Sequence, residues 1–142
     1  MKQDNKIVQQ IIECFKRGNS VYVFGNGGSL ADASHFAAEF NGIGPVIALN
    51  DSAKITSIGN DSLFLYIFSQ QILDLGKKGD LAIGISSSGK SANVLLGLDM
   101  AKARKLETLD FPRKGKTTQE VQNYQYSLLH TIFLLVKKGM NE

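Results

Sequence analysis

The chain has 142 residues, of which 43% are hydrophobic and 20% charged, a composition that is ordinary for a globular protein and excludes a mainly disordered chain. The 16 Lys and Arg residues exceed the 13 Asp and Glu residues by a net charge of +3, and the length suits one domain over residues 1–142. The single cysteine, Cys14, excludes an intramolecular disulfide framework and a cysteine-based zinc finger.

Helices and strands are expected to alternate along the chain. Apolar residues at helical spacing alternate with short β-type runs, some of which end in a glycine-rich or serine-rich turn. The predicted elements, in chain order, are a helix at 7–15, a strand at 21–24, a helix at 30–40, a strand at 45–49, a helix at about 61–75, a strand at 80–85, a helix at 92–104, a strand at 107–111 and a helix at about 118–138.

This order predicts an α/β fold of three layers, in which a parallel sheet is flanked by helices and binds ligands at the carboxyl ends of its strands. Only four strand-like runs are present, and no room is left for a fifth after Phe111. We therefore expect a sheet with a shortened C-terminal edge.

No apolar run reaches the roughly 18 residues that a transmembrane helix needs. Residues 1–6 also lack the apolar core of a signal peptide. We therefore expect a cytoplasmic protein that has no membrane partner.

The last predicted helix carries no charged residue from Val121 to Val136, and apolar residues occupy most of its faces. A helix of this kind is normally buried, and so small a sheet would leave part of it uncovered. We therefore expect homo-oligomers formed through this helix, with Leu129 and Leu134 at the contact between subunits.

Two turns between a strand and a helix can approach an anion. Residues 25–29, Gly-Asn-Gly-Gly-Ser, permit close approach of backbone N–H groups but match neither a dinucleotide-binding loop nor a Walker loop. Residues 86–91, Ser-Ser-Ser-Gly-Lys-Ser, place four hydroxyls beside the positive end of a helix. The alternative for this second turn is a serine-rich helix cap without a ligand.

Polar side chains stand inside two otherwise apolar helices. His35 and Glu39 are four residues apart and share a face, whereas Gln122 and His130 are eight apart, which is about 80° of rotation. A lone histidine in such surroundings is more often part of a core. Two histidines, a carboxylate and an amide together would instead suit a zinc site or an acid–base pair. Their spacing alone does not show that the two helices meet.

Basic residues concentrate in the stretch 102–116. The simplest interpretation is a solvated helix end and loop, and the alternative is a contact with phosphate or another polyanion. No aromatic residues with the spacing of an RNA-binding sheet accompany the stretch, so we do not expect a nucleic-acid partner.

The motifs of the chain occur in an order that resembles one enzyme family, the phosphoheptose isomerases, which are built on a sugar-isomerase (SIS) domain. The likeness covers most of the chain, as a single SIS domain, and runs through residues 25–29, 31–39, 58–61, 79–80, 84–94 and 121–130. It implies an isomerase that converts sedoheptulose 7-phosphate to D-glycero-D-manno-heptose 7-phosphate, a heptose precursor for lipopolysaccharide or related glycans. It also implies a homotetramer with sites where subunits meet.

The resemblance assigns roles to the matched residues. Glu39 and His130 match the catalytic base and acid. The zinc ligands of the family match His35, Glu39, Gln122 and His130. The positions that bind the sugar phosphate match Asn26, Gly27, Gly28, Ser29, Asp61, Ser86, Ser87, Ser88, Ser91 and Gln122. Zinc is thus the cofactor that the resemblance implies.

The chain departs from the family in three places. Ile43 stands where the family usually has an arginine, residues 107–119 are too few for the family's further helical turn and fifth strand, and Gln119-Glu120 replaces Asp-Arg. An alternative function is a non-catalytic SIS module that binds sugar phosphate or a protein, such as an initiator-associating replication factor. That relative lacks the glutamate and the histidine that this chain keeps, which favours the enzyme. A weaker alternative is a polyanion-binding oligomer.

Overall fold

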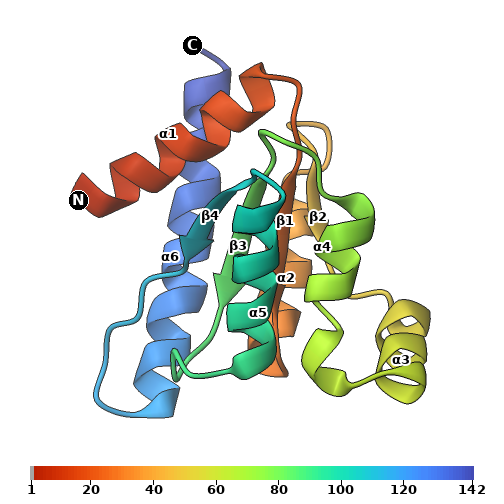
Figure 1. The fold of residues 1–142 in the computed structure, drawn as a ribbon. Helices are drawn as coiled ribbons and strands as arrows, with labels where there is room; N and C mark the ends of the chain where they lie inside the picture. Colours follow the sequence, from red (N-terminus) through yellow and green to blue (C-terminus); the bar gives the residue numbers. More distant parts are fainter. Residues whose placement is uncertain (1) are drawn as a thin grey trace.

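A computed structural model describes residues 2–142 of the chain (Figure 1). Its elements are α1 (Lys2–Lys16), β1 (Val21–Gly25), α2 (Gly28–Glu39), β2 (Val46–Ala48), α3 (Ser52–Asp61), the 3₁₀ helix η1 (Phe64–Tyr66), α4 (Ser69–Leu75), β3 (Leu81–Ile85), α5 (Ala92–Ala103), β4 (Glu107–Asp110) and α6 (Thr118–Met140).

The four strands form one parallel sheet in the order β2-β1-β3-β4. In register, Val21 lies beside Val46 on one side and Leu81 on the other, and Leu81 lies beside Glu107. The outer strands are short: β2 has 3 residues and β4 has 4. The expected parallel α/β sheet is therefore confirmed, with β4 as its edge on the C-terminal side.

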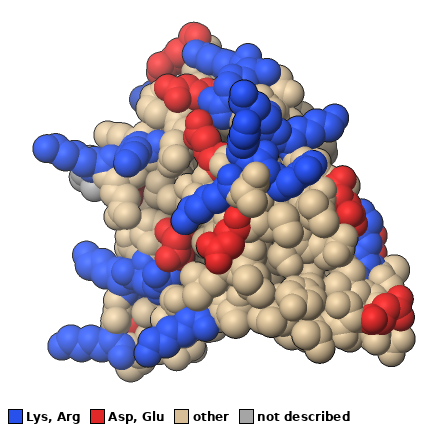
Figure 2. Space-filling model, viewed as in Figure 1, with Lys and Arg blue, Asp and Glu red and all other residues tan. Residues whose placement is uncertain are grey.

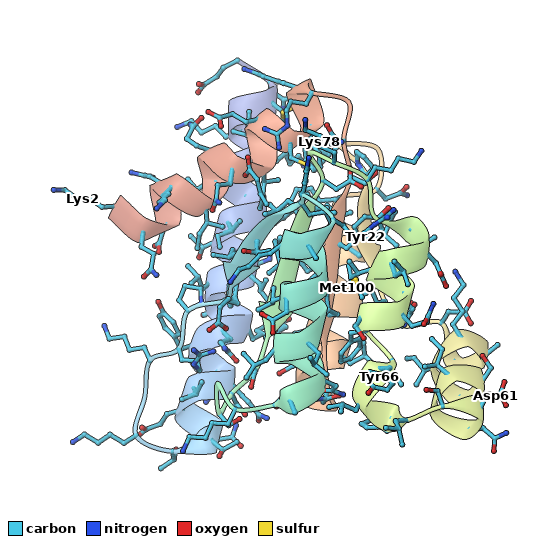
Figure 3. All side chains as sticks on the ribbon, in the orientation of Figure 1. Lys2, Tyr22, Asp61, Tyr66, Lys78 and Met100 are labelled. Carbon is cyan, nitrogen blue, oxygen red and sulfur yellow. The ribbon has the colours of Figure 1, made fainter. Side chains whose placement is uncertain are left out.

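Helices cover both faces of the sheet, which gives the expected three layers (Figure 1). Val21 and Val23 of β1 pack into a core with α1, α2 and α6, whereas Tyr22 and Phe24 pack into a second core with α4 and α5. Tyr22 also donates a hydrogen bond of 3.1 Å to the carbonyl of Leu75 at the end of α4, on the side of the sheet that Figure 3 shows. Every residue of β1 and β3 is buried, as in a sheet covered on both faces.

The helix predicted at about 61–75 is wrong in its first part. The chain forms α3 earlier, because Asp51 caps it by accepting a hydrogen bond of 3.1 Å from the N–H of Lys54. Ser62 then leaves the helical region with φ −132° and ψ −114°, and η1 precedes α4. Since α3 buries none of its residues, it lacks the apolar periodicity by which a helix is recognised in a sequence.

The chain itself covers one face of α6 and leaves the opposite face exposed. Its buried residues pack against α1, α2 and the sheet, and Leu129, which was expected at a subunit contact, is only 3% exposed in this core. Leu129 is therefore not available for a contact between subunits, whereas Leu134, which is 50% exposed, is available. The large apolar side chains that α6 leaves exposed are Tyr126, Leu134 and Leu135.

Within residues 2–142 no helix combines the length and the apolar character needed to cross a lipid bilayer.

The basic stretch at 102–116 divides between two parts of the molecule. The exposed side chains at the end of α5 and in the connection from β4 to α6 are Lys102, Arg104, Lys105, Lys114 and Lys116. Basic and acidic side chains interleave over the upper part of the face in Figure 2. Arg113 differs from the others, because its guanidinium contacts residues of the serine-rich turn.

The burial of α6 predicts opposite outcomes for two similar substitutions. Leu129→Glu places a charge in the core and should lower the free energy of unfolding by about 4 kcal/mol or more. Ser127→Glu, at an exposed position of the same helix, should lower it by less than about 1 kcal/mol. Urea unfolding followed by circular dichroism measures both. Equal stability of the two variants would contradict this assignment of the buried face.

Candidate active site

The two helices that carry the predicted catalytic residues lie against each other on one face of the sheet. Aromatic rings fasten them: Phe40 follows α2 and packs on Phe36 at 4.8 Å and on Phe133 of α6 at 5.2 Å between ring centroids, both edge to face. This packing brings Glu39 beside His130, with Nδ1 of His130 2.8 Å from Oε2 of Glu39. The predicted acid and base therefore meet within one chain.

The carboxylate of Glu39 is the buried centre of this group. Its side chain is 14% exposed, whereas those of His35 and His130 are 54% and 52% exposed. Oε2 accepts the hydrogen bond from His130, and Oε1 lies 3.6 Å from Nε2 of His35 with no hydrogen-bond partner among the described residues. A mostly buried carboxylate between two accessible imidazoles has the chemistry of a proton acceptor beside proton carriers.

Further side chains of α6 face α2 at intervals of four residues. The amide Nε2 of Gln122 lies 3.5 Å from the place where a side chain at Gly28 would begin, so Gln122 covers the start of α2. The ring of Tyr126 lies 5.8 Å from that of His35, between centroids. Sequence reasoning missed Tyr126, although its spacing of four residues from both Gln122 and His130 places all three on one face.

Asp32 is a second acidic group on α2, one turn before His35. Burial raises the pKa of its carboxyl, and the nearby charge of His35 lowers it in part. Asp32 lies in the matched stretch 31–39, where no role was predicted for it.

The donor chemistry of the group fits zinc. Two imidazoles, a carboxylate and an amide are ligand types that zinc accepts, and the unpartnered Oε1 of Glu39 is free to bind a cation. The side chains of residues 2–142 are not, however, arranged as a close group of three His, Cys, Asp or Glu residues around one point. A metal bound by His35, Glu39, Gln122 and His130 would therefore require side-chain rotation.

The glycine-rich turn links the carboxyl end of β1 to α2. A Cβ atom at Gly25 would lie 2.5 Å from the carbonyl oxygen of Ile85, so only glycine lets β1 and β3 approach this closely. Asn26 is held by a reciprocal pair of hydrogen bonds with Asn93 of α5, at 2.8 and 2.9 Å. Gly27 precedes α2 with φ +55°, and Gly28 and Ser29 form its first turn.

The serine-rich turn gathers its hydroxyls at the start of α5. Oγ of Ser86 lies 3.3 Å from Oγ of Ser88 and 3.2 Å from Oγ of Ser91. The N–H of Gly89 donates to Ser86 Oγ, and the N–H of Lys90 donates to Ser88 Oγ, each at 3.0 Å. Hydroxyls and amides thus converge beside the positive end of the helix, as in a site for an anion. Ser87 lies in the same turn and is half-buried.

The two turns face each other across a hollow. Its volume is about 300 Å³, and its lining includes Asn26 from the first turn and Ser91 from the second, together with Phe64 of η1. The structure thereby brings together two groups of predicted substrate-binding residues. It does not add Asp61, which is exposed at the end of α3, accepts a hydrogen bond from the neighbouring Asn60 and lies toward the outside of the molecule (Figure 3).

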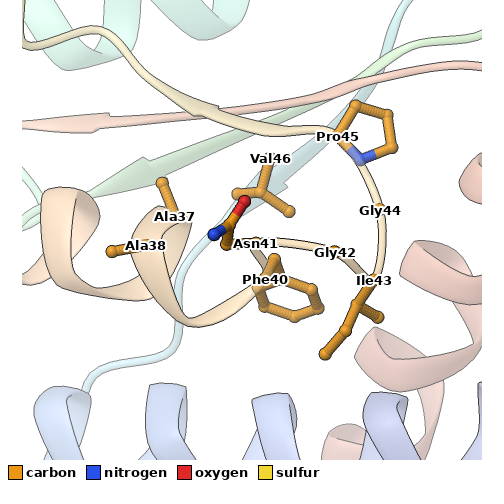
Figure 4. Close-up of a pocket in the computed structure, with 9 residues that line it drawn as sticks. All are labelled: Ala37, Ala38, Phe40, Asn41, Gly42, Ile43, Gly44, Pro45 and Val46. Carbon is orange, nitrogen blue, oxygen red and sulfur yellow. The ribbon is translucent and has the colours of Figure 1, made fainter.

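A separate cavity of about 810 Å³ lies where the chain passes from α2 to β2 (Figure 4). Its lining residues are Ala37, Ala38, Phe40, Asn41, Gly42, Ile43, Gly44, Pro45 and Val46. None of these side chains is titratable, and Asn41 is the one with a polar group. The cavity therefore cannot perform acid–base chemistry by itself.

Comparison with known proteins gives a consistent result. The SIS domain family model matches residues 3–109. A phosphoheptose isomerase from Fusobacterium nucleatum is 36% identical to the chain, and the match covers 98% of this chain and 84% of that protein. One from Campylobacter jejuni is 33% identical, with 94% and 85% covered. The first alignment spans 162 positions, more than the 142 residues of the chain, so the relative has segments that this chain lacks.

Solved structures resemble the fold closely. The structure of a phosphoheptose isomerase from Neisseria gonorrhoeae superposes with a TM-score of 0.93 at 29% identity, covering 97% of this chain and 86% of that one. A phosphoheptose isomerase structure from Francisella tularensis superposes with a TM-score of 0.92 at 24% identity, covering 95% and 84%. At 24% identity, the likeness to the Francisella tularensis structure shows a shared fold and no more.

The serine-rich turn predicts stabilisation by a bound anion. Inorganic phosphate at about ten times its dissociation constant should raise the melting temperature by about 3–6 °C. Ser88→Ala combined with Ser91→Ala should remove most of this increment, because two of the converging hydroxyls are lost. The control is Ser52→Ala with Ser57→Ala on α3, where both serines are exposed. Equal increments in the two double variants would remove the turn from the anion site.

Proposed function

Because the chain belongs to the SIS domain family and, within it, to the phosphoheptose isomerases, we propose that it isomerises sedoheptulose 7-phosphate to D-glycero-D-manno-heptose 7-phosphate. The observation that carries this function is the contact between Glu39 and His130, 2.8 Å apart at the surface between α2 and α6. The names of the relatives favour the enzyme over a non-catalytic SIS module.

The reaction moves one proton between neighbouring carbons and one between neighbouring oxygens. The carboxylate of Glu39 removes the proton from the carbon beside the carbonyl and returns it to the former carbonyl carbon. The imidazole of His130 transfers the proton between the two oxygens through an enediol. Each proton transfer by a positioned side chain contributes about 10²–10⁴-fold to the rate.

The serine-rich turn would bind the phosphate at the far end of the sugar. Its hydroxyls and amides hold a group that takes no part in the proton transfers, so the binding energy positions the reacting carbons. Asn26, Gly27, Gly28, Ser29 and Gln122 are proposed as contacts to the sugar.

Zinc is the proposed cofactor, held by His35, Glu39, Gln122 and His130. When bound, zinc polarises the carbonyl and stabilises the negative charge of the enediolate. The support for this proposal is the donor set and the unpartnered Oε1 of Glu39.

Zinc binding is tested directly on the metal-free protein. After dialysis against a chelator, the chain should take up one zinc ion per subunit, as measured by mass spectrometry of the metal and by titration calorimetry. His35→Ala should weaken the affinity by about 10-fold or more, because a ligand is lost. The proposal fails if the unmodified protein binds no zinc, or if His35→Ala binds it equally well.

A homotetramer is the proposed assembly, as the family resemblance implies. Exposed apolar side chains support it: Leu134 is 50% exposed on α6, Leu63 is 54% exposed directly before η1, and Phe64 is 61% exposed within η1. We further propose that the enzyme is cytoplasmic and that its product serves the synthesis of heptose for lipopolysaccharide or related glycans.

The assembly should depend on the outer face of α6. Leu134→Glu places a charge in the proposed contact and should reduce the mass found by light scattering at micromolar concentration. Gln119→Glu adds the same charge at an exposed position near the start of α6 and should leave the mass unchanged. A monomeric unmodified protein would contradict the proposal.

Substitution of the two central residues separates catalysis from binding. Glu39→Gln keeps the shape of the side chain but cannot accept a proton from carbon, so turnover should fall by about 10³-fold. His130→Asn should lower it to a similar degree. Affinity for sugar phosphate, measured by calorimetry, should change little for Glu39→Gln. Glu13→Gln, an exposed amide substitution on α1, is the control for turnover followed by NMR. Full activity of Glu39→Gln would refute the assignment.

A further inference from the structure

Arg113 lies against the serine-rich turn, although it is 22 residues after that turn's last residue, Ser91, in the sequence. A Cβ atom at Gly89 would lie 2.8 Å from Cζ of Arg113 and 2.9 Å from its Nε, so the guanidinium occupies the space of a side chain at that position. Gly89 has φ +73°, in the left-handed region that favours glycine. NH1 of Arg113 also donates a hydrogen bond of 3.4 Å to the carbonyl of Ser86. One guanidinium thus contacts both ends of the Ser86–Gly89 segment.

Asp110, the last residue of β4, fixes the position of the Arg113 side chain. NH1 and NH2 of the guanidinium donate to the two carboxylate oxygens at 2.8 and 2.9 Å, which is a bidentate pair. This hydrogen bonding raises the pKa of Arg113 above its usual value. Because β4 pairs with β3 in the sheet, the pair anchors Arg113 to the strand that leads into the turn.

A third side chain joins the same region. Gln125 of α6 is fully buried, and its Nε2 donates to the carbonyl of Ser86 at 3.1 Å and to that of Pro112 at 3.2 Å. Gln125 thereby links the turn to Pro112, the residue directly before Arg113. The shortened connection from β4 to α6 is therefore part of the support of the turn.

We propose that Arg113 is a positioning residue of the phosphate site, which holds the serine-rich turn in the conformation that binds a phosphate monoester. This inference rests on the proposed function and adds a residue that the family resemblance does not assign. By packing on Gly89 and binding the Ser86 carbonyl, the guanidinium keeps the N–H groups of Gly89 and Lys90 directed at the hydroxyl cluster. Because Asp110 balances its charge, Arg113 acts on the site through the position of the turn.

The planar arrangement of the guanidinium N–H groups of Arg113 matters in addition to the charge of the side chain. A lysine at position 113 would keep a positive charge but could not bind both oxygens of Asp110 and the Ser86 carbonyl at once. Arg113→Lys should therefore keep only part of the phosphate affinity that Arg113→Ala loses. This graded response separates positioning from a purely electrostatic role.

The test measures phosphate affinity with and without turnover. Arg113→Ala should raise KM for sedoheptulose 7-phosphate by about 10-fold while kcat stays within about 2-fold. The dissociation constant of inorganic phosphate, measured by calorimetry, should rise by the same factor. Arg113→Lys should show about a 3-fold rise in both constants. Arg104→Ala, an exposed arginine of the same basic stretch at the end of α5, is the matched control and should change neither.

The outcomes distinguish this inference from the proposed isomerase. If the unmodified protein binds phosphate but does not isomerise the sugar, the proposed function is wrong and the calorimetric comparison still decides the role of Arg113. Unchanged phosphate affinity in Arg113→Ala overturns the inference, as does a loss confined to kcat or to melting temperature. It is also overturned if the unmodified protein has no measurable affinity for phosphate.

Discussion

The hydrogen bond between Glu39 and His130 joins two helices whose bonded residues are 91 positions apart in sequence, and the proposed chemistry depends on it. It can form only because α2 and α6 pack on the same face of the parallel sheet, fastened by the rings of Phe40 and Phe133. The same packing buries the carboxylate while both imidazoles stay accessible. A mostly buried base beside a solvent-exposed proton carrier is thus a consequence of the way the two helices pack.

The loops supply the second requirement, which is an anion site at the carboxyl ends of β1 and β3. Both turns begin where a strand ends, so the order of the strands places them side by side. The reciprocal amide pair of Asn26 and Asn93 then fixes one turn to the helix that follows the other. The connection from β4 to α6 carries Arg113, whose guanidinium donates to the carbonyl of Ser86, and Gln125 of α6 donates to the same carbonyl.

Much of this arrangement could be predicted from the sequence, because strongly periodic segments and strand–turn–helix transitions carry local signals. The four strands, the helix that holds His35 and Glu39, and both turns follow from such signals. The helix α3 could not be found in this way, since it buries no residue and forms through its Asp51 cap. The burial of Leu129 and the contact of Arg113 with Gly89 were also beyond reach, because each depends on which segments meet in space. The contact of Glu39 with His130 was suggested by resemblance, and spacing alone did not establish it.

The central claim is that a carboxylate on α2 and an imidazole on α6 move protons between neighbouring carbons and oxygens of a sugar phosphate. The most direct measurement is the isomerisation of sedoheptulose 7-phosphate in deuterium oxide, followed by NMR. Transfer through Glu39, a group that exchanges its proton with solvent, predicts deuterium at carbon 2 of the heptose product. Isomer formed without solvent deuterium at carbon 1 or carbon 2 would contradict transfer through a group that exchanges its proton with solvent.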